Sequence, residues 1–344
     1  MASETVAARR PVLEIEDLRT HFFSRAGVVP AVDGVSYRLY PGETLGVVGE
    51  SGCGKSVTAL SVLGLIPRAA GRIVSGRILF EGRDLVTASD EEIRAIRGNK
   101  ISMIFQEPMS SLNPVLTIGR QISETIRLHQ GLDRKSALDK AEEMLRLVHI
   151  SEPHRRIGEY PHQLSGGMRQ RVMIAMALAC NPTVLLADEP TTALDVTIQA
   201  QILDLMQDLQ SKLGAAMVMI THDLGVIAQV AQRVVVMYAG RKVEEATVQD
   251  LFDAPCHPYT HGLLQSIPRI EYARLEARGG KRPRLKEIDG VVPSPRDRPN
   301  GCLFAPRCTL ATDLCRAEYP PLEEKRPGHL AACWHSDRIT GASA

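Results

Sequence analysis

The pattern of apolar and polar residues predicts a chain in which short strands alternate with helices. Leu13 and Ile15 alternate with Glu14 and Glu16, which is typical of a half-buried strand. Continuous short apolar runs, which are typical of buried strands, recur further along the chain. The predicted strands cover residues 12–18, 34–39, 44–48, 76–80, 100–105, 184–187, 217–221 and 234–238. Turns are expected at Gly27 and Gly240 because glycine adopts turn conformations without steric cost.

Helices are predicted between these strands. Apolar residues recur at helical spacing from residue 118 to residue 148, with a break at Gly131, and Ser89 is placed to cap a short helix. The predicted helices cover residues 57–65, 89–97, 118–148 and 198–209. Strands separated by helices indicate a mostly parallel sheet with helices on both faces, that is, an α/β fold. The first strands are expected to form a small separate sheet.

Composition and charge narrow the class of protein. The 344 residues are 44% hydrophobic, and 41 Lys and Arg balance 40 Asp and Glu. This balance gives no support for nucleic acid as a partner, although residues 269–298 are basic. We find no signal-peptide pattern, and the longest apolar run, residues 172–180, is too short to span a bilayer. We therefore expect a cytoplasmic protein that reaches the membrane only through partners.

The chain changes character near residue 253, where proline, arginine and cysteine become frequent. We expect a loose tail over residues 1–11, one domain over residues 12–252 with a helical insert at about 107–175, and an irregular extension over residues 253–344. Four cysteines of the extension could supply one tetrahedral ligand set, for which zinc is the ordinary metal, or could simply be buried. They are Cys302, Cys308, Cys315 and Cys333.

A glycine-rich stretch between the predicted strand 44–48 and the helix 57–65 indicates a phosphate-binding loop. Its residues are Gly49, Glu50, Ser51, Gly52, Cys53, Gly54, Lys55 and Ser56. Backbone N–H groups and the helix N-terminus favour an anion, Lys55 can reach the outer phosphates, and Ser56 is placed to ligate magnesium. An ordinary glycine-rich turn is the alternative, and Cys53 is expected to be an inert small residue.

Further motifs follow this loop in a fixed order. They are Gln106 at a strand end, the Leu164 to Met168 stretch containing Ser165, Gly166 and Gly167, the Leu185 to Glu189 strand end, Asp195, and Thr221 to Asp223. With this set, residues 12 to about 250 resemble the ATP-binding subunits of ABC transporters. The resemblance implies a P-loop ATPase core of the RecA-like kind, with a small antiparallel β subdomain and a helical subdomain.

The resemblance also implies roles for individual residues. Asp188, Ser56 and Gln106 would hold Mg²⁺, Glu189 would act as the general base, and His222 and Gln106 would contact the γ-phosphate. A structural histidine is the alternative for His222. Phe22 matches the aromatic residue that stacks on adenine, and Phe23 is a neighbouring possibility.

In the resembled family the serine–glycine stretch faces the phosphate loop of an opposing subunit, so that two nucleotides lie between two ATPase subunits. Ser165, Gly166, Gly167 and Asp195 would then contact nucleotide. Met168 stands where the common pattern has glutamine. We expect it to be tolerated, because the contacts to phosphate come from the serine and the backbone.

The extension resembles that of oligopeptide and dipeptide importer ATPases, through the Ala254 to Thr260 and Gly301 to Cys308 stretches. In that subfamily such cysteines are associated with a [4Fe–4S] cluster, which we expect here with zinc as the alternative. The implied function is the ATPase of a peptide importer at the cytoplasmic face of the cell membrane.

The implied partners are a second ATPase, expected to be a different F-type chain, two transmembrane permease subunits and, through them, an extracytoplasmic peptide-binding protein. An importer of nickel or another small solute, or a soluble ABC ATPase acting on DNA or ribosomes, is the alternative function. The DNA-acting enzymes usually carry a long coiled coil and the ribosomal ones two ATPase units, and this chain has neither feature.

Overall fold

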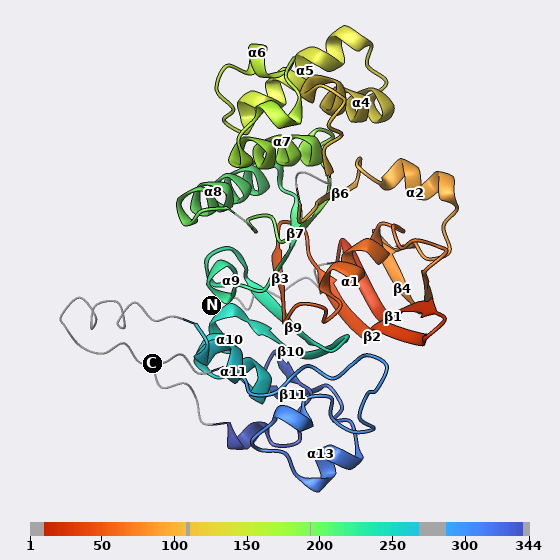
Figure 1. The fold of residues 1–344 in the computed structure, drawn as a ribbon, viewed down its shortest axis with the longest axis vertical. Helices are drawn as coiled ribbons and strands as arrows, with labels where there is room; N and C mark the ends of the chain where they lie inside the picture. Colours follow the sequence, from red (N-terminus) through yellow and green to blue (C-terminus); the bar gives the residue numbers. More distant parts are fainter. Residues whose placement is uncertain (1–9, 108–110, 193, 268–286, 340–344) are drawn as a thin grey trace, which may run out of the picture.

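The computed structural model describes residues 10–107, 111–192, 194–267 and 287–339, and contains two sheets (Figure 1). The smaller sheet is antiparallel, with strand order β2-β1-β4-β5. Its strands are β1 (Leu13–Ser24), β2 (Gly27–Leu39), β4 (Gly71–Phe80) and β5 (Arg83–Asp84). The separate small sheet expected from the sequence is therefore confirmed. Most of residues 1–11, the expected tail, lie outside the described residues.

The strands of the small sheet are longer than predicted. The register of β1 against β2 shifts between Leu18 and Arg19 and again between Thr20 and His21. Each shift interrupts the alternation of apolar and polar positions, so the sequence pattern ends before the strand does. The turn expected at Gly27 is confirmed, since Ser24 pairs with Gly27 and the latter has a φ of 117°.

The larger sheet has the strand order β11-β12-β10-β9-β3-β8-β7-β6. From β9 to β6 neighbouring strands are parallel, as predicted, and the strands from β9 to β11 pair antiparallel. The bounds are β3 (Thr44–Val48), β6 (Ile101–Ile104), β7 (Val184–Asp188), β8 (Ala216–Thr221), β9 (Arg233–Tyr238), β10 (Arg241–Thr247), β11 (Glu323–Arg326) and β12 (His329–Ala331). Every residue of β3, β7 and β8 is buried, which explains their continuous apolar runs.

Strand β10 was not predicted, because its sequence is charged. Glu244 and Glu245 are nevertheless buried, and Lys242 donates to Glu245 Oε2 over 2.6 Å. Arg233 of β9 also pairs with Glu245. Ion pairs to a neighbouring strand therefore replace the apolar pattern that usually marks a buried strand.

The helices cover the large sheet and form a separate helical region, seen at the top of Figure 1. Residues 118–148 form two helices, divided as predicted at Gly131, which has a φ of 67°. Ser89 and Glu92 form a reciprocal capping box at the expected short helix. Among the described residues up to 230, the helices are α1 (Lys55–Val62), α2 (Asp90–Ile96), α4 (Ile118–Gln130), α5 (Arg134–Leu147), α6 (Pro153–Arg156), the 3-10 helix Pro161–Gln163, α7 (Gly166–Leu178), α8 (Val196–Leu213) and α9 (Leu224–Val230).

The C-terminal extension packs against the β10 side of the large sheet and adds β12 and β11 to it (Figure 1). Its helical segments, with the helix that precedes it, are α10 (Val248–Asp253), α11 (Pro258–Gln265), α13 (Asp313–Ala317) and the 3-10 helices Ala305–Arg307 and Ser336–Arg338. Residues 268–286, which include much of the basic region, lie outside the described residues. Across the described ranges, no helix combines the length and the hydropathy that a bilayer span requires.

Candidate functional site

The predicted site residues meet at one edge of the large sheet. The phosphate loop follows β3, His222 follows β8, Asp188 ends β7, and Gln106 lies shortly after β6. These strands are parallel neighbours, so their carboxyl ends share one edge, where ligands of such sheets bind.

The phosphate loop is held in a conformation that requires glycine. Gly49 has a φ of 151° and Gly54 a φ of 101°. A Cβ atom would lie 2.2 Å from the Met237 carbonyl oxygen at the first position and 2.4 Å from the Ala31 carbonyl oxygen at the second. The loop therefore lies directly against the backbone of β9 and β2, and only glycine fits there.

Lys55 points back into this loop. Its Nζ atom donates to the carbonyl oxygens of Gly49, over 2.6 Å, and Glu50, over 3.1 Å, and the residue is only 5% exposed. The ammonium group thus occupies the concave side of the loop, where a phosphate would bind. Ser51 and Gly52 are exposed at its mouth. Cys53 is buried, and burial raises the pKa of its thiol, in agreement with an inert side chain.

Ser56 and Asp188 form the candidate magnesium site. The Ser56 hydroxyl donates to Asp188 Oδ1 over 2.9 Å, at the start of α1 and the end of β7. Burial raises the pKa of Asp188, although the hydrogen bond from Ser56 opposes the shift. A hydroxyl and a buried carboxylate are oxygen ligands that suit Mg²⁺, and a divalent cation would favour the ionised carboxylate. The residues therefore fit the metal that the sequence implies.

Glu189 is the centre of a second group of contacts. His222 Nδ1 lies 3.1 Å from Glu189 Oε1, while Gln106 Nε2 and Thr192 Oγ1 donate to Oε2 over 3.0 and 2.9 Å. Burial alone would raise the pKa of Glu189, but the hydrogen bonds from His222 and Thr192 hold it below the ordinary value. Glu189 is therefore an ionised proton acceptor next to Asp188. It adopts a φ of 46°, a strained conformation for a residue with a side chain.

Ser165 and Asp195 each cap a helix at the surface. The Ser165 hydroxyl accepts from the Met168 N–H at the start of α7, and Asp195 accepts from the Ile198 N–H at the start of α8. Both residues are exposed, as is Gly166. The two starts are neighbours, since a Cβ on Gly167 would lie 3.0 Å from Ile198.

Phe22 is half-buried in β1, where its ring lies against Gly71 of β4. Its neighbour Phe23 is 39% exposed and lies under the guanidinium of Arg72. β1 is tied to α1 by a buried hydrogen bond between Thr20 and Ser61, which places this strand beside the helix that follows the phosphate loop.

The four cysteines of the extension line one cavity, together with His257, Phe304 and Trp334. Backbone N–H groups of Phe304, Ala305, Leu310 and His335 hydrogen-bond to the sulfur atoms of Cys302, Cys308 and Cys333. Burial raises the pKa of these three thiols, that of Cys333 to about 12. Soft thiolate donors supported by N–H groups fit a bound metal, which would keep the thiolates ionised.

A bound zinc ion would require a close approach of the four sulfur atoms. A zinc ion about 2.3 Å from each sulfur would hold the sulfurs roughly 3.8 Å apart. Within the residues that the structure describes, no three of the four sulfurs lie within 4.8 Å of one another. The thiols would therefore have to converge further to hold a zinc ion.

Two contacts of the extension were missed by sequence reasoning. Arg307 pairs with Glu50 of the phosphate loop, with Nη1 2.7 Å from Oε2. Glu244, Cys256 and His329 bring a carboxylate, a thiol and an imidazole together in the interior. Glu244 Oε1 and His329 Nε2 are 2.6 Å apart, which is a hydrogen bond and closer than two ligands of one metal ion would be. Each contact joins residues far apart in the chain, so no local pattern could indicate it.

Comparisons with known proteins agree with this geometry. Residues 32–192 match the ABC transporter family model, and residues 243–315 match the model for the oligopeptide/dipeptide transporter C-terminal region. A probable peptide ABC transporter ATP-binding protein of Sinorhizobium fredii is 55% identical over 95% of this chain and 96% of its own. The oligopeptide transport ATP-binding protein AppD of Bacillus subtilis is 51% identical over 94% and 96%.

Among solved structures, the ATP-binding cassette MJ0796, in a dimeric post-hydrolysis state with bound ADP and phosphate, matches with a TM-score of 0.62 and 28% identity. The match covers 69% of this chain and 98% of that one. The fold expected from the sequence is thereby confirmed. The identity and coverage of the relatives leave one assignment: the chain belongs to the ATP-binding proteins of ABC transporters, in the oligopeptide and dipeptide transport family.

Proposed function

We propose that this chain is the ATP-hydrolysing subunit of a peptide importer and acts at the cytoplasmic face of the cell membrane. The observation that carries the proposal is the ionised Glu189 held by Gln106 and His222 beside the Ser56–Asp188 pair. Peptides are the proposed solute because relatives at more than 50% identity are described as peptide transport proteins and share the extension.

In the proposed reaction, the triphosphate of ATP enters the phosphate loop and Lys55 exchanges its loop carbonyls for phosphate oxygens. Magnesium, held by Ser56 and Asp188 with Gln106 nearby, would neutralise charge on the phosphates. A water molecule attacks the γ-phosphorus, its proton passes to Glu189, and the bond from that phosphorus to the bridging oxygen breaks to leave ADP and phosphate. His222, within hydrogen-bond distance of Glu189, orients the base.

A second ATPase subunit would complete the nucleotide site. Ser165, Gly166 and Asp195 are exposed next to one another on elements separate from the phosphate loop, so within one chain they present a free phosphate-binding surface. Val196, which follows Asp195, is 83% exposed. An apolar side chain in water beside helix N-termini favours a partner that covers this surface. MJ0796, a fold relative, is described as a dimer.

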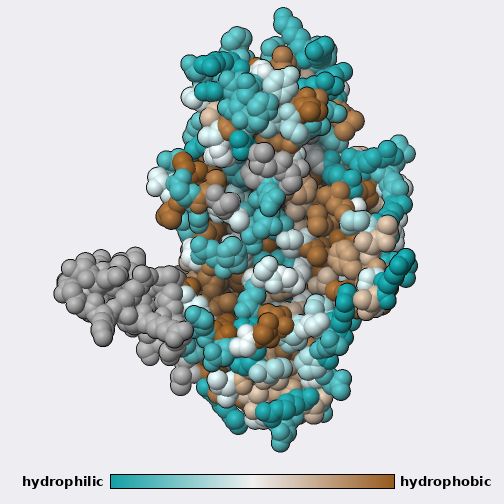
Figure 2. Space-filling model, in the orientation of Figure 1, coloured by the Kyte–Doolittle hydropathy of each residue, from teal (hydrophilic) through white to brown (hydrophobic). Residues whose placement is uncertain are grey.

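Contact with permease subunits is proposed for the segment after Gln106. Val115 is 75% exposed in this segment. Separately, one face of the molecule carries hydrophobic residues towards its middle, between hydrophilic ends (Figure 2). Pro108 to Ser110, which belong to this segment, lie outside the described residues. Two permeases and an external peptide-binding protein complete the proposed importer, in which nucleic acid has no part.

For the cysteine cavity we propose a [4Fe–4S] cluster rather than zinc. Four thiolates are the usual ligand set of such a cluster, and the four cysteines line one cavity. Anaerobic purification followed by iron, sulfide and zinc analysis tests this. About four iron atoms per chain with a visible absorption band support the cluster, and one zinc per chain without iron refutes it.

The central test is ATP hydrolysis by the assembled transporter in vesicles. Glu189→Gln should bind ATP normally while phosphate release falls about 10²- to 10⁴-fold, the usual contribution of a general base. Asp208→Asn, which changes an exposed carboxylate of α8, is the matched control and should keep normal turnover. Near-normal phosphate release by the Glu189 variant would refute the base, and ATP-independent peptide uptake would refute the function.

A further inference from the structure

The extension reaches the phosphate loop through one arginine. Arg307 ends a 3-10 helix directly before Cys308, and its side chain is 4% exposed. Its two terminal nitrogens form a paired contact with Glu50, Nη1 to Oε2 over 2.7 Å and Nη2 to Oε1 over 3.0 Å. Such fork-like pairs are stronger and more directional than single hydrogen bonds.

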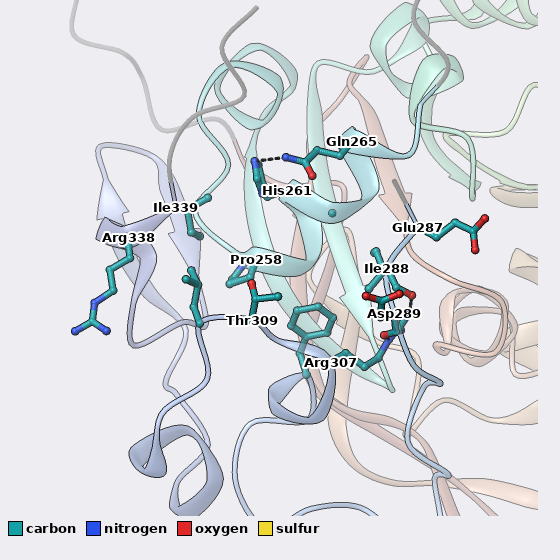
Figure 3. A pocket seen from close by; sticks show the side chains of 13 residues that line it. Pro258, His261, Gln265, Glu287, Ile288, Asp289, Arg307, Thr309, Arg338 and Ile339 are labelled. Carbon is teal, nitrogen blue, oxygen red and sulfur yellow. Dashed lines mark hydrogen bonds between the residues drawn. The ribbon is translucent and has the colours of Figure 1, made fainter. Parts of the chain in front are cut away.

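Arg307 is itself held in place from the extension. Its Nε donates to the carbonyl oxygen of Asp289 over 3.0 Å, and Nη2 donates to that of Ile288 over 3.1 Å. Figure 3 shows the Arg307 side chain running towards these two residues at the side of a pocket. The guanidinium therefore has a fixed position, and its contact with Glu50 holds that carboxylate in place as well.

Glu50 is held from a second side. Its backbone N–H donates to the Tyr259 hydroxyl of α11 over 2.8 Å, and this ring is fully buried against Tyr238 and Phe304. Both the main chain and the side chain of one phosphate-loop residue are thus bound by the region after residue 253. Within the loop, Glu50 is also the one acidic side chain, beside the carbonyls that Lys55 contacts.

We propose that Arg307 is a positioning residue for ATP binding, which neutralises Glu50 and holds the phosphate loop open for the triphosphate. The inference rests on the proposed function for the identity of the ligand. Without Arg307, the Glu50 carboxylate would repel the incoming phosphates and the loop would lose an anchor. Both effects weaken nucleotide binding, while the base Glu189 and its partners are untouched.

The test measures equilibrium binding of a non-hydrolysable ATP analogue with Mg²⁺ to the purified full-length chain, so a failure of the proposed hydrolysis does not affect it. Arg307→Gln should weaken binding about tenfold, and in the assembled transporter it should raise KM by a similar factor with kcat within about twofold of wild type. Arg316→Gln, beside Cys315 and paired with the exposed Asp313, is the control and should bind normally.

A double-variant cycle separates positioning from a merely structural role. If Arg307 acts by neutralising Glu50, Arg307→Gln should weaken analogue binding less than about threefold in a chain that already carries Glu50→Gln. Arg307→Lys keeps the charge but not the paired contact, so its affinity for the analogue should lie between those of wild type and Arg307→Gln. It replaces the glutamine variant in the test if that variant does not fold. The proposal would be overturned if Arg307→Gln weakened analogue binding equally in the wild-type and Glu50→Gln backgrounds. It would also be overturned if Arg307→Gln or Arg307→Lys bound the analogue as well as Arg316→Gln does.

Discussion

The buried pair of Glu244 and His329 gives a prediction whose size follows from the structure. Glu244 is 0% and His329 1% exposed, and the pair joins β10 to β12. Burial works against the charged imidazole, but hydrogen bonds to Cys256 and Glu244 raise the pKa of His329 to about 9, from an ordinary value of 6.5. A rise of this size corresponds to about 3 kcal/mol of stability for the folded extension.

The direction of the pH dependence follows from the raised pKa. Because the folded state binds the proton more tightly than the unfolded state, the stabilisation is complete below pH 6.5 and is lost as the pH rises through about 9. His329→Gln removes the charge and leaves the Glu244 carboxylate buried without a cationic partner. We expect the variant to lose about 3 kcal/mol at pH 6 and much less at pH 10.

Trp334 makes the measurement local, since it is the single tryptophan of the chain and lies in the extension. Urea unfolding followed by its fluorescence at pH 6 and pH 10 gives the stability of wild type and variant. His154→Gln, which changes a histidine that is 93% exposed and 3.4 Å from Glu142, is the control and should have little effect. A His329→Gln difference below about 1 kcal/mol at pH 6, or one independent of pH, would refute the reasoning.

Three further substitutions test other parts of the site. Gly54→Ala should abolish detectable binding of an ATP analogue, because the new Cβ would meet the Ala31 carbonyl oxygen at 2.4 Å and displace the loop. Cys308→Ser should lower the iron content of the anaerobically purified chain at least severalfold, whereas Cys180→Ser, outside the cysteine cavity, should not. Ser165→Ala should leave analogue binding to the isolated chain within about twofold but reduce ATP hydrolysis by the transporter about tenfold or more, as measured by phosphate release. These expectations would be contradicted by unchanged analogue binding in Gly54→Ala, unchanged iron content in Cys308→Ser, or unchanged ATP hydrolysis in Ser165→Ala.

Local patterns predicted the strands of the parallel core but not their neighbours. Strands β3, β7 and β8 were found because all their residues are buried and most are apolar, with Thr44, Asp188 and Thr221 only at strand ends. Strand β10 was missed because Glu244 and Glu245 are paired with His329 and Arg233, which no window of a few residues contains. The pairing of β12 with β10 depends on the same distant contacts and was missed for the same reason.

In the candidate site, too, the sequence indicated individual residues but not the contacts between them. The order of motifs along the chain indicated Gln106, Glu189 and His222, and the roles proposed for them stay predictions until a variant is measured. Their mutual contacts depend on the order β8-β7-β6, which the apolar runs do not specify. Arg307 and Glu50 are separated by 257 residues, so only the folded chain reveals their contact.

The pairing of β12 with the outer side of β10 determines where this protein can be truncated without exposing a strand. A gene shortened at codon 253, to isolate the nucleotide-binding module, would remove β12 and leave β10 unpaired on the side away from β9. Exposed strands of that kind recruit strands from other molecules, so we expect such a fragment to precipitate when overexpressed. Co-expression of residues 287–339 as a separate polypeptide offers a route to recover soluble material, since it returns the missing strand.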